Sequence, residues 1–540
     1  MDWDTQPDPF RRYDGARKIP LPFMGRDDTP PYDQIIRGDQ PPPEAVSIET
    51  IGQLFELSMG LSAWKEFQGS RWALRVNPSS GNLHPTESYL LTGPDTDGRI
   101  IERLPDSPVV AHYAPVDHSL EIRCEFPMET WPELMEGFPD GAFLVGLSSV
   151  HWREAWKYGE RAFRYCQHDA GHALAALRIS AAVLGWQLVQ LQDLADSEIA
   201  TLLGLDREDG FHPSEPEHSD MLCVVIPSRI DNLEIPMDLP SGAIEEIGKG
   251  NWIGKPNQLS KDHVDWDIIT DVATAADKPK TNLPTSPPIG LTQPFEGANP
   301  DPSTWREYSA RKIILQRRSA VSMDGHTSIN AGTFYRMLEA TLPYRPGSEV
   351  PPCPWDATHW PVSVHLGLFV HLVEGIPPGL YTLCRDPSQF ERLRSAFNRD
   401  FLWRKPPKCP DHLPLYLLSE GDARRVAAQV SCQQDIAGAG AFSFGMLADF
   451  EATLEHFGPW HYKRLFWETG MIGQVLYLEA EAAGIRSTGI GCFFDDPVHD
   501  LFGLSGWDFQ SLYHFTVGGP VEDTRLQTEP PYSEEIRRRE

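Results

Sequence analysis

Two long segments of the chain are apolar on nearly every helical face. They are residues 171–185 (GHALAALRISAAVLG) and 470–484 (GMIGQVLYLEAEAAG). A helix with this pattern has no face for water and must be covered on every side. A glycine directly after the apolar run is a typical signal for a helix C-terminus. The pattern therefore predicts two buried helices, and such helices fit the centre of an interface between two domains.

Short strand-like runs precede each of these helices. They are Ser88–Leu91 and Phe143–Leu147 in the first half, and Val362–Leu372 and Leu415–Leu418 in the second half. Runs of this length and composition are typical of β-strands. Helices that lie beside such strands indicate a layered sandwich in each half, so we expect an α+β fold.

The glycines of the two halves recur at the same spacing. Three of them, separated by 14 and 19 residues, reappear at a constant offset of 299, at positions 171, 185 and 204 and at positions 470, 484 and 503. Each triplet brackets a long helix, a short segment and a second helical turn that ends in Gly-Leu. Such a recurring order is the signature of an internal repeat. The sequence predicts a tandem of two related domains.

A proline-rich stretch separates the two repeats. Seven prolines lie between Ala275 and Ser303, where apolar periodicity is almost lacking. This composition is typical of an extended linker. We therefore expect an N-terminal extension over residues 1–46, a first domain over 47–230, a linker or lid over 231–304, and a second domain over 305–540.

The charge balance limits the partners of the protein. The chain carries 47 basic and 77 acidic residues, a formal net charge of −30. This excess repels nucleic-acid backbones and anionic membranes, so neither is an expected partner. Residues 170–191 are long enough to span a membrane, but they carry His172, Arg178, Gln187 and Gln190 and are better interpreted as a buried helix. The first residues show no secretory signal, so we expect a cytoplasmic protein.

The cysteines and histidines give no metal or redox motif. The eight cysteines lie at least 23 residues apart and form no Cys-x-x-Cys pair, so zinc-ribbon, redox-dithiol and disulfide-framework interpretations lose support. His168 and His172 have the spacing of helical metal ligands, but no third ligand is evident. Capping or core histidines are the favoured interpretation, and no metal is expected. Dinucleotide and P-loop motifs are absent as well.

Three stretches carry candidate chemistry. Residues 75–87 (RVNPSSGNLHPTE) form a turn dense in hydroxyl and amide groups, which suits a flat polar ring unless it is an ordinary turn. Arg317-Arg318-Ser319 suits a phosphate, because charge-assisted hydrogen bonds to phosphate are strong, unless it is a solvated surface pair. Gly489-Ile490-Gly491 would let the backbone approach a planar ligand and present N–H groups, unless it is only a tight turn.

Taken together, these residues resemble the nitroreductase-like flavoprotein family, and most closely its SagB-type dehydrogenase branch. The resemblance covers about residues 47–229 and 305–532. It implies two fused three-layer α/β/α domains that form an intramolecular pseudo-dimer around the long central helices, an arrangement compatible with a monomer. It also implies FMN at the interface of the two halves. FAD is not expected, because no adenine-binding Rossmann unit is present.

The resemblance assigns the phosphate end of the flavin site. Arg317 and Ser319 fall on the R-x-S positions that bind the phosphate in the family, with Arg318 between them. Arg525 matches a basic residue near the phosphate. Val321 departs from the family, since many relatives have Lys or Arg there, so one phosphate contact is missing or comes from elsewhere.

The resemblance also assigns the residues that surround the flavin ring. The loop that the other subunit contributes in family members is matched by Pro78, Ser79, Ser80 and Asn82. The loop along the isoalloxazine face is matched by Gly489, Ile490 and Gly491.

Lys157 and Tyr158 begin a K-Y-G-x-R stretch that looks like the one leading into the central helix of the family. In SagB-type dehydrogenases this pair is thought to handle protons while a peptide azoline is oxidised to an azole. The resemblance thus implies a modified-peptide substrate and peptide-modifying partner enzymes. A small nitro, quinone or enone compound is an alternative substrate. The alternative interpretation of the K-Y-G-x-R stretch is a surface helix start without a catalytic role.

The flavin-site elements divide unequally between the halves. A second flavin pocket on the opposite side of the pseudo-dimer would need its own R-x-S element, glycine loop and P-S-x-x-N loop. At these places the chain reads IIRG at 35–38, QLQ at 190–192 and PPCPWD at 351–356, and none of them fits. The sequence therefore predicts an FMN-dependent oxidoreductase with one composite flavin site. The alternative is a scaffold that binds flavin or a partner and whose catalytic groups have decayed.

Overall fold

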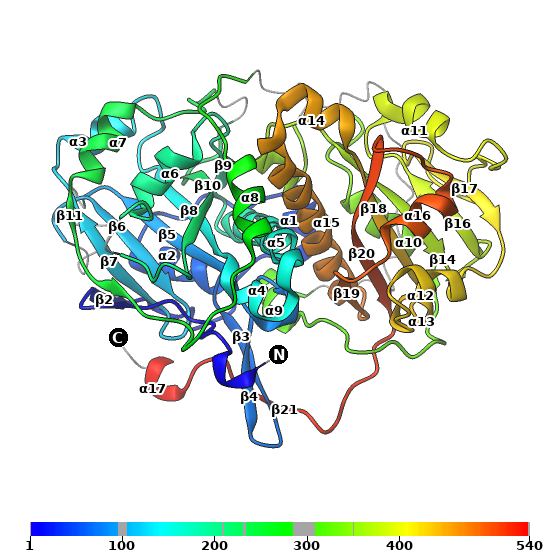
Figure 1. Ribbon diagram of the computed structural model, residues 1–540, viewed down its shortest axis with the longest axis horizontal. Coiled ribbons are helices and arrows are strands. Elements are labelled where there is room, and N and C mark those ends of the chain that lie inside the picture. The colour runs from blue at the N-terminus through cyan, green and yellow to red at the C-terminus, as the bar shows by residue number, and fades with distance from the viewer. Residues whose placement is uncertain are drawn as a thin grey trace.

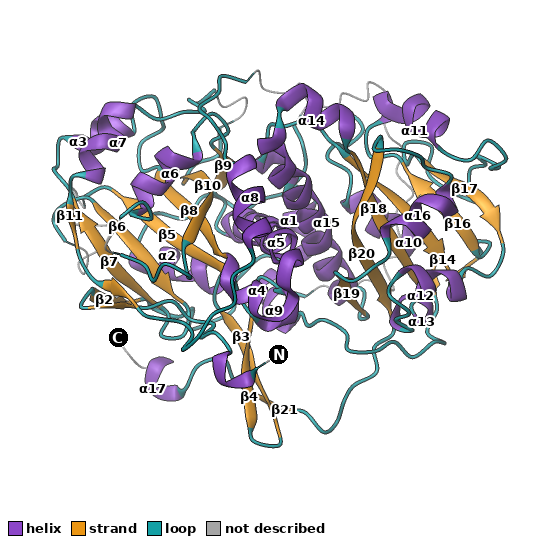
Figure 2. Ribbon diagram, in the orientation of Figure 1, coloured by secondary structure: helices purple, strands orange, loops and turns teal. Residues whose placement is uncertain are grey.

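Two β-sheets flank a pair of long central helices (Figure 1). The computed structural model describes residues 2–94, 105–207, 210–230, 234–283, 308–348 and 350–537. Figure 2 shows the strands of the first half on the left and those of the second half on the right, with α5 (Ala162–Val183) and α15 (Tyr462–Ala482) between them. This arrangement confirms the predicted α+β fold around long central helices.

The two main sheets share one antiparallel strand order. In the first half the order is β7-β6-β5-β8-β10-β9, and in the second half it is β17-β16-β14-β18-β20-β19. The first set comprises β5 (Thr86–Thr92), β6 (Val109–Ala114), β7 (Ser119–Glu125), β8 (Phe143–Val150), β9 (Gln187–Gln190) and β10 (Glu217–Ile226). The second comprises β14 (Val364–Val370), β16 (Gly379–Leu383), β17 (Leu415–Glu420), β18 (Phe442–Asp449), β19 (Arg486–Ile490) and β20 (Phe509–Gly518). The four predicted strands correspond to β5, β8, β14 and β17.

Each sheet buries both of its faces, which produces three layers in each half. Leu90 of β5 and Leu366 of β14 belong to one large core shared with α5 and α15. The next residue along β5, Leu91, faces an outer core with helices of the first half. Phe369 of β14 faces a third core with outer helices of the second half. This alternation follows from the two-residue period of a strand.

The central helices cross at the paired glycines of the repeat. A Cβ atom on Gly171 would overlap the backbone oxygen of Trp467, and one on Gly470 would overlap that of His168. Only residues without a side chain let two backbones approach this closely. Both helices are buried along nearly their whole length. No helix among the described residues is long and apolar enough to cross a membrane.

Further helices pack against the two sheets and the central pair, and α2 and α10 share the inner core with α5 and α15. In the first half they are α2 (Ile48–Glu56), α3 (Thr130–Leu134), α4 (His151–Tyr158), α6 (Asp196–Leu203), α7 (Ser241–Gly248) and α8 (Asp267–Ala275). In the second they are α10 (Ala331–Ala340), α11 (Phe390–Ala396), α12 (Arg424–Val430), α13 (Ile436–Ala439), α14 (Glu451–Phe457) and α16 (Asp495–Phe502). Helices α6 and α16 both end at a left-handed glycine, Gly204 (φ 69°) and Gly503 (φ 76°), as the repeat predicts.

The segments outside the two predicted domains are largely folded where the structure describes them. Residues 2–46 contain β1 (Tyr13–Asp14), β2 (Arg17–Pro20) and α1 (Tyr32–Ile36), and β2 pairs with β7. Of the expected linker, residues 234–283 contain α7, α8, β11 (Asn251–Trp252) and β12 (Lys255–Pro256). The proline-rich stretch after residue 283 lies outside the described residues, which resume at residue 308 before α9 (Ala310–Gln316). A short pair, β13 (Ile329–Asn330) with β15 (Val373–Glu374), follows.

The C-terminus returns to the first half. Strand β21 (Gln527–Glu529) pairs with β3 (Leu61–Phe67), which forms a hairpin with β4 (Ser70–Arg75), and α17 (Glu534–Arg537) follows. This three-stranded sheet projects at the bottom of Figure 1. Tyr532 is buried beside it and its hydroxyl accepts a hydrogen bond from the backbone N–H of Leu61 at 2.9 Å. The last residues of the chain therefore complete an element that begins near residue 61.

One disulfide bond corrects the interpretation of the cysteines. Cys432, just after α12, is bonded to Cys492, just after β19, with their Cα atoms 5.8 Å apart. The two residues are 60 positions apart in the sequence. The pair was not evident from spacing, because the contact depends on how α12 packs beside the end of β19.

Candidate functional site

A cavity of about 460 Å³ lies where the two halves meet. Its wall combines the β3–β4 hairpin and the loop 77–84 of the first half with residues 317–321 and 486–492 of the second. Ten of the eleven predicted flavin-binding residues line it, namely Pro78, Ser79, Ser80, Asn82, Arg317, Arg318, Ser319, Gly489, Ile490 and Gly491. The structure thus brings the two predicted sets together in one place.

One end of the cavity is strongly cationic. Arg317 is only 4% exposed, and its Nη2 donates to the backbone oxygens of Arg75 and Val76, both at 3.0 Å, while its Nε has no partner among the described residues. Burial, together with the charge of Arg317, lowers the pKa of Arg318 to about 10. Burial and the charges of Arg318 and Arg486 lower the pKa of Lys65. This mutual repulsion is what an anion in the cavity would relieve.

Asp169 of α5 holds the loop 78–82 in place. The backbone N–H of Ser80 donates to both carboxylate oxygens of Asp169 at 3.3 Å, and Ser79 Oγ accepts from the N–H of His84 at 2.8 Å. Gly81 and Asn82 adopt left-handed conformations, with φ of 63° and 57°. A tight turn of this kind, in which the backbone is bonded to a buried carboxylate, presents its side chains in one defined arrangement.

Neighbouring tyrosines require the glycines at the end of β19 and directly after it. A Cβ atom on Gly489 would overlap Tyr513 Oη, and one on Gly491 would overlap the ring of Tyr165. The N–H of Gly489 donates to Tyr477 Oη at 3.0 Å. This corrects the expectation that the segment offers free N–H groups, since that of Gly489 is already bonded within the protein.

Tyr477 connects the predicted elements and was missed from the sequence. Its hydroxyl also accepts a hydrogen bond from Ser319 Oγ at 3.0 Å, and its ring centroid lies 4.9 Å from the guanidinium carbon of Arg317. It is the one aromatic residue in the apolar run 470–484, a signal that could have identified it. Lys65 and Arg486 were missed as well. They reach the cavity from β3 and β19, and no local pattern marked them.

The structure does not bring Arg525 to the cavity wall. Its side chain is 74% exposed and pairs with Asp523, with Nη2 2.7 Å from Oδ2. The chain leaves β20 at Gly518 and runs toward β21, which leaves Arg525 on the outer surface. Arg486 and Lys65 supply positive charge at the cavity instead.

Lys157 and Tyr158 meet the cavity at the turn around Gly81. A Cβ atom on Gly81 would lie 2.6 Å from Tyr158 Oη and 2.8 Å from Lys157 Nζ. Tyr158 also borders a neighbouring cavity of about 810 Å³, together with Lys157, Trp156 and Trp266. Burial raises the pKa of Tyr158, so its hydroxyl stays protonated at neutral pH and can donate a hydrogen bond.

Two buried carboxyl groups lie next to this pair. Glu154 of α4 and Asp169 of α5 are both buried, and Asp169 lines the cavity. Burial raises the pKa of both groups, and the charge of Asp169 raises that of Glu154 further. Carboxyl groups whose pKa is raised by burial can keep a proton and deliver it beside Lys157 and Tyr158.

The histidines of α5 are held in the core. His168 Nδ1 lies 2.8 Å from Thr469 Oγ1, and its ring stacks on Tyr513 at 4.1 Å between centroids. Burial lowers the pKa of His168 to about 3, and that of His172 falls as well. Within the described ranges, no group of three or more His, Cys, Asp or Glu side chains is arranged to hold a metal ion.

Another cavity, of about 370 Å³, is lined by residues of the second half. Glu468 and Met471, which follow Asp169 and His172 at the 299-residue offset, line it. Glu468 is ion-paired with Arg385 and accepts from the N–H of Ser363 at 3.0 Å. This pair lies within the protein, and Arg486 at the cavity of about 460 Å³ is likewise paired, with Glu522.

Comparison with known proteins identifies the family. The model of the nitroreductase family matches residues 42–212 and 402–519, more than half of the chain. The chain belongs to the nitroreductase family. A solved structure that covers nearly the whole chain is that of a candidate nitroreductase from Anabaena variabilis, with 19% identity, 96% of this chain and 95% of that chain covered, and a TM-score of 0.64. It shows that the fold extends across both halves.

Other solved structures match smaller parts of the chain. The McbBCD microcin synthetase of E. coli, solved with truncated pro-MccB17, has 19% identity over 35% of this chain and 66% of that chain, with a TM-score of 0.27. The FMN-dependent nitroreductase NfnB of Mycobacterium smegmatis, solved with NADPH, has 14% identity over 39% and 87%, with a TM-score of 0.20. No curated protein matches the chain.

The residues of this nitroreductase-family cavity fit FMN. The unpartnered Nε of buried Arg317 shares the cavity with three further cations, Lys65, Arg318 and Arg486, and this donor set suits a single phosphate. Trp72, Tyr158 and the loop 78–82 line the rest of the cavity with aromatic, hydroxyl and amide groups suited to a polar planar ring.

Proposed function

We propose that the protein is an FMN-dependent oxidoreductase with one composite flavin site between its halves. The observation that carries the proposal is the partnerless Nε of buried Arg317 in a cationic cavity built from both halves. Arg317, Arg318, Lys65 and Arg486 would hold the phosphate, and the loop 78–82 would contact the ring. Bound FMN supplies hydride transfer, and the chain supplies orientation and charge.

The proton chemistry is assigned to the turn beside Gly81. Tyr158 keeps its proton and would donate a hydrogen bond to the substrate, while Lys157 would take up or return a proton at Nζ. Glu154 and Asp169, with their raised pKa values, would hold a proton close to both groups. Positioned acid–base groups of this kind contribute about a hundredfold to ten-thousandfold to a rate.

The Lys157-Tyr158 pair favours a SagB-type dehydrogenase that oxidises a modified peptide together with peptide-modifying partner enzymes. The neighbouring cavity of about 810 Å³, with Trp156 and Trp266 on its wall, gives such a substrate room on the far side of Tyr158. We assign the two domains to residues 47–230 and 305–540. The common strand order and the 299-residue offset support their origin by tandem duplication.

The test is the flavin content of the purified protein. We expect flavin absorption bands, release of FMN on denaturation, and one FMN per chain by protein-normalised absorbance. Asn82→Ala should weaken the same site from the first half. Release of FAD, or the absence of flavin, would contradict the cofactor, and two FMN per chain would contradict the composite site. Bound FMN that no substrate or reduced nicotinamide reduces would favour a decayed scaffold.

A further inference from the structure

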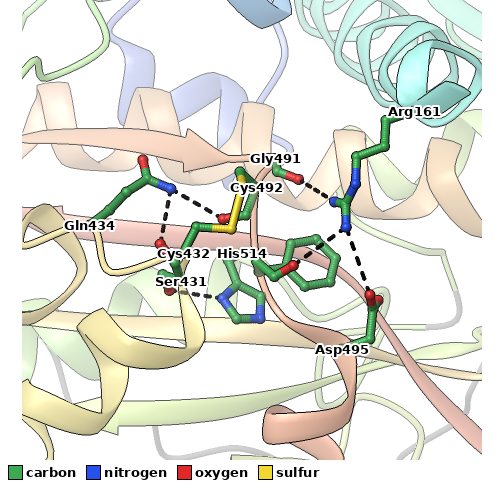
Figure 3. The surroundings of a disulfide bond; sticks show 9 residues. Arg161, Ser431, Cys432, Gln434, Gly491, Cys492, Asp495 and His514 are labelled. Atoms are coloured by element: carbon green, nitrogen blue, oxygen red, sulfur yellow. Dashed lines mark hydrogen bonds and ion pairs between the residues drawn. A yellow bond between two sulfur atoms is a disulfide. The ribbon is translucent and has the colours of Figure 1, made fainter. Parts of the chain in front are cut away.

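The disulfide bond between Cys432 and Cys492 is drawn in Figure 3, and Cys492 places it at the wall of the proposed flavin cavity. Cys492 follows Gly491 directly and lines the cavity together with Gln434. Cys492 is exposed, and Cys432 is half-buried. The free cysteines of the described residues are buried, apart from half-buried Cys409. Exposed disulfides are the ones that exchange readily with other thiols, whereas buried cysteines are inert.

The two cysteine segments are held together by contacts that do not involve sulfur. Gln434 Nε2 donates to the backbone oxygens of Ser431 at 3.0 Å and Cys492 at 3.1 Å, so one side chain bridges both segments (Figure 3). The N–H of Phe494 donates to the backbone oxygen of Val430 at 2.8 Å. The S–S bond can therefore open and close while its surroundings stay in place.

The first half also fixes the position of this loop. Arg161 Nη1 donates to the backbone oxygen of Gly491 at 3.2 Å, and Nη2 reaches that of Phe493 at 3.5 Å. Arg161 follows Tyr158 by three residues, on the same turn that meets Gly81. The disulfide, the proposed proton-handling turn and the flavin cavity are therefore parts of one connected surface.

The cysteine pair has no counterpart in the first half. At the 299-residue offset, Cys432 corresponds to Glu133 and Cys492 to Asp193. The pair thus occurs only in the half that supplies the phosphate end of the cavity. A disulfide needed to stabilise the repeated fold would be equally useful in both halves, so its single occurrence points to the site.

We propose that the Cys432–Cys492 disulfide accepts electrons from the reduced flavin and passes them to an external disulfide. This inference rests on the proposed function and supplies its electron acceptor. The disulfide takes two electrons and two protons from reduced FMN: the S–S bond breaks, two S–H bonds form, and the flavin returns to its oxidised form. The dithiol then attacks an external disulfide through a mixed-disulfide intermediate, which restores the internal bond and releases two external thiols.

The experiment counts electrons and thiols in the flavin-loaded protein. The flavin is reduced anaerobically by light and EDTA, and the cysteines are then alkylated and located by mass spectrometry. The wild type should take up four electrons per chain and show alkylation at Cys432 and Cys492. The double variant Cys432→Ser/Cys492→Ser should take up two, and flavin-free protein treated identically should keep the disulfide. Oxidised glutathione should reoxidise the wild-type flavin anaerobically but not that of the variant.

The outcomes separate the two proposals. Alkylation of the wild type needs no variant, so it remains decisive if the double variant does not fold. Fully reduced FMN beside an intact disulfide, with an uptake of two electrons per chain, would overturn the electron-acceptor role and leave the proposed function standing. Protein that holds no FMN at all would overturn both.

Discussion

Arg317→Ala offers the most direct test of the phosphate end of the cavity. The substitution removes the free Nε and the two hydrogen bonds to the backbone oxygens of Arg75 and Val76. A hydrogen bond to a charged group contributes about 1.5–3 kcal/mol. Because about 1.4 kcal/mol corresponds to a tenfold change, the dissociation constant of FMN should rise about 12-fold to 140-fold.

Riboflavin distinguishes a phosphate contact from a general defect, because it lacks the phosphate but keeps the ring. Titration of flavin-free protein, followed by quenching of flavin fluorescence, should show that Arg317→Ala loses affinity for FMN while its weaker affinity for riboflavin is unchanged. Arg317→Lys should fall between the two proteins, since it keeps the charge but not the forked donor geometry. Arg525→Ala is the matched control and should bind FMN like the wild type, because its side chain is exposed and paired with Asp523.

Equal losses of FMN and riboflavin affinity in Arg317→Ala would refute the phosphate assignment. They would mean that Arg317 acts only by holding the carbonyl groups of Arg75 and Val76 in place. Denaturant unfolding of the flavin-free proteins measures that contribution separately. An unchanged affinity of Arg317→Ala for FMN would refute the assignment of the cationic end of the cavity to the phosphate.

Three further perturbations test other parts of the structure. Lys157→Ala or Tyr158→Phe should leave FMN content unchanged but slow turnover of the true substrate by about a hundredfold or more, and full turnover would remove the pair from the mechanism. Gly470→Ala should lower the free energy of unfolding by about 1–3 kcal/mol or more, since the added methyl group meets backbone atoms of α5. The control Gly242→Ala in α7 should be neutral or stabilising, because a methyl group there makes only ordinary contacts. Equal chemical denaturation curves for the two variants would contradict this. Asp169→Asn should be more stable than the wild type above about pH 4, by a margin that grows with pH. The raised pKa of Asp169 favours folding only while the carboxyl group is protonated, and this contribution is lost as pH rises from the unfolded pKa near 4 toward the folded pKa. A margin in the free energy of unfolding that does not vary with pH would show that this pKa is not raised.

The fold could be predicted where a local pattern reflects a packing requirement. Gly171 and Gly470 stand at equivalent places in two apolar runs, and the structure shows that each touches the backbone of the other helix. The same holds for Gly204 and Gly503, which end α6 and α16. In these cases one backbone geometry requires a glycine, so the spacing in the sequence carries the three-dimensional information.

The site was predictable only in part, because several of its residues owe their position to long-range pairing. Lys65 reaches the cavity from β3, whose edge is paired with β21 from the far end of the chain. Arg525 was expected near the phosphate, but the path of the chain after β20 leaves it on the surface. Cys432 and Cys492 meet because α12 packs beside the end of β19. No short-range pattern contains these contacts.

The return of the C-terminus to β3 sets the order in which the protein can mature during synthesis. Leu61 binds the hydroxyl of Tyr532, a residue 471 positions later. At about 5–20 residues per second, the ribosome needs about 25–90 s to bridge that interval. Throughout this time the hairpin that carries Lys65 lacks its third strand. A truncation before Gln527 would therefore leave both main sheets intact but remove the strand that pairs with this hairpin beside the cavity.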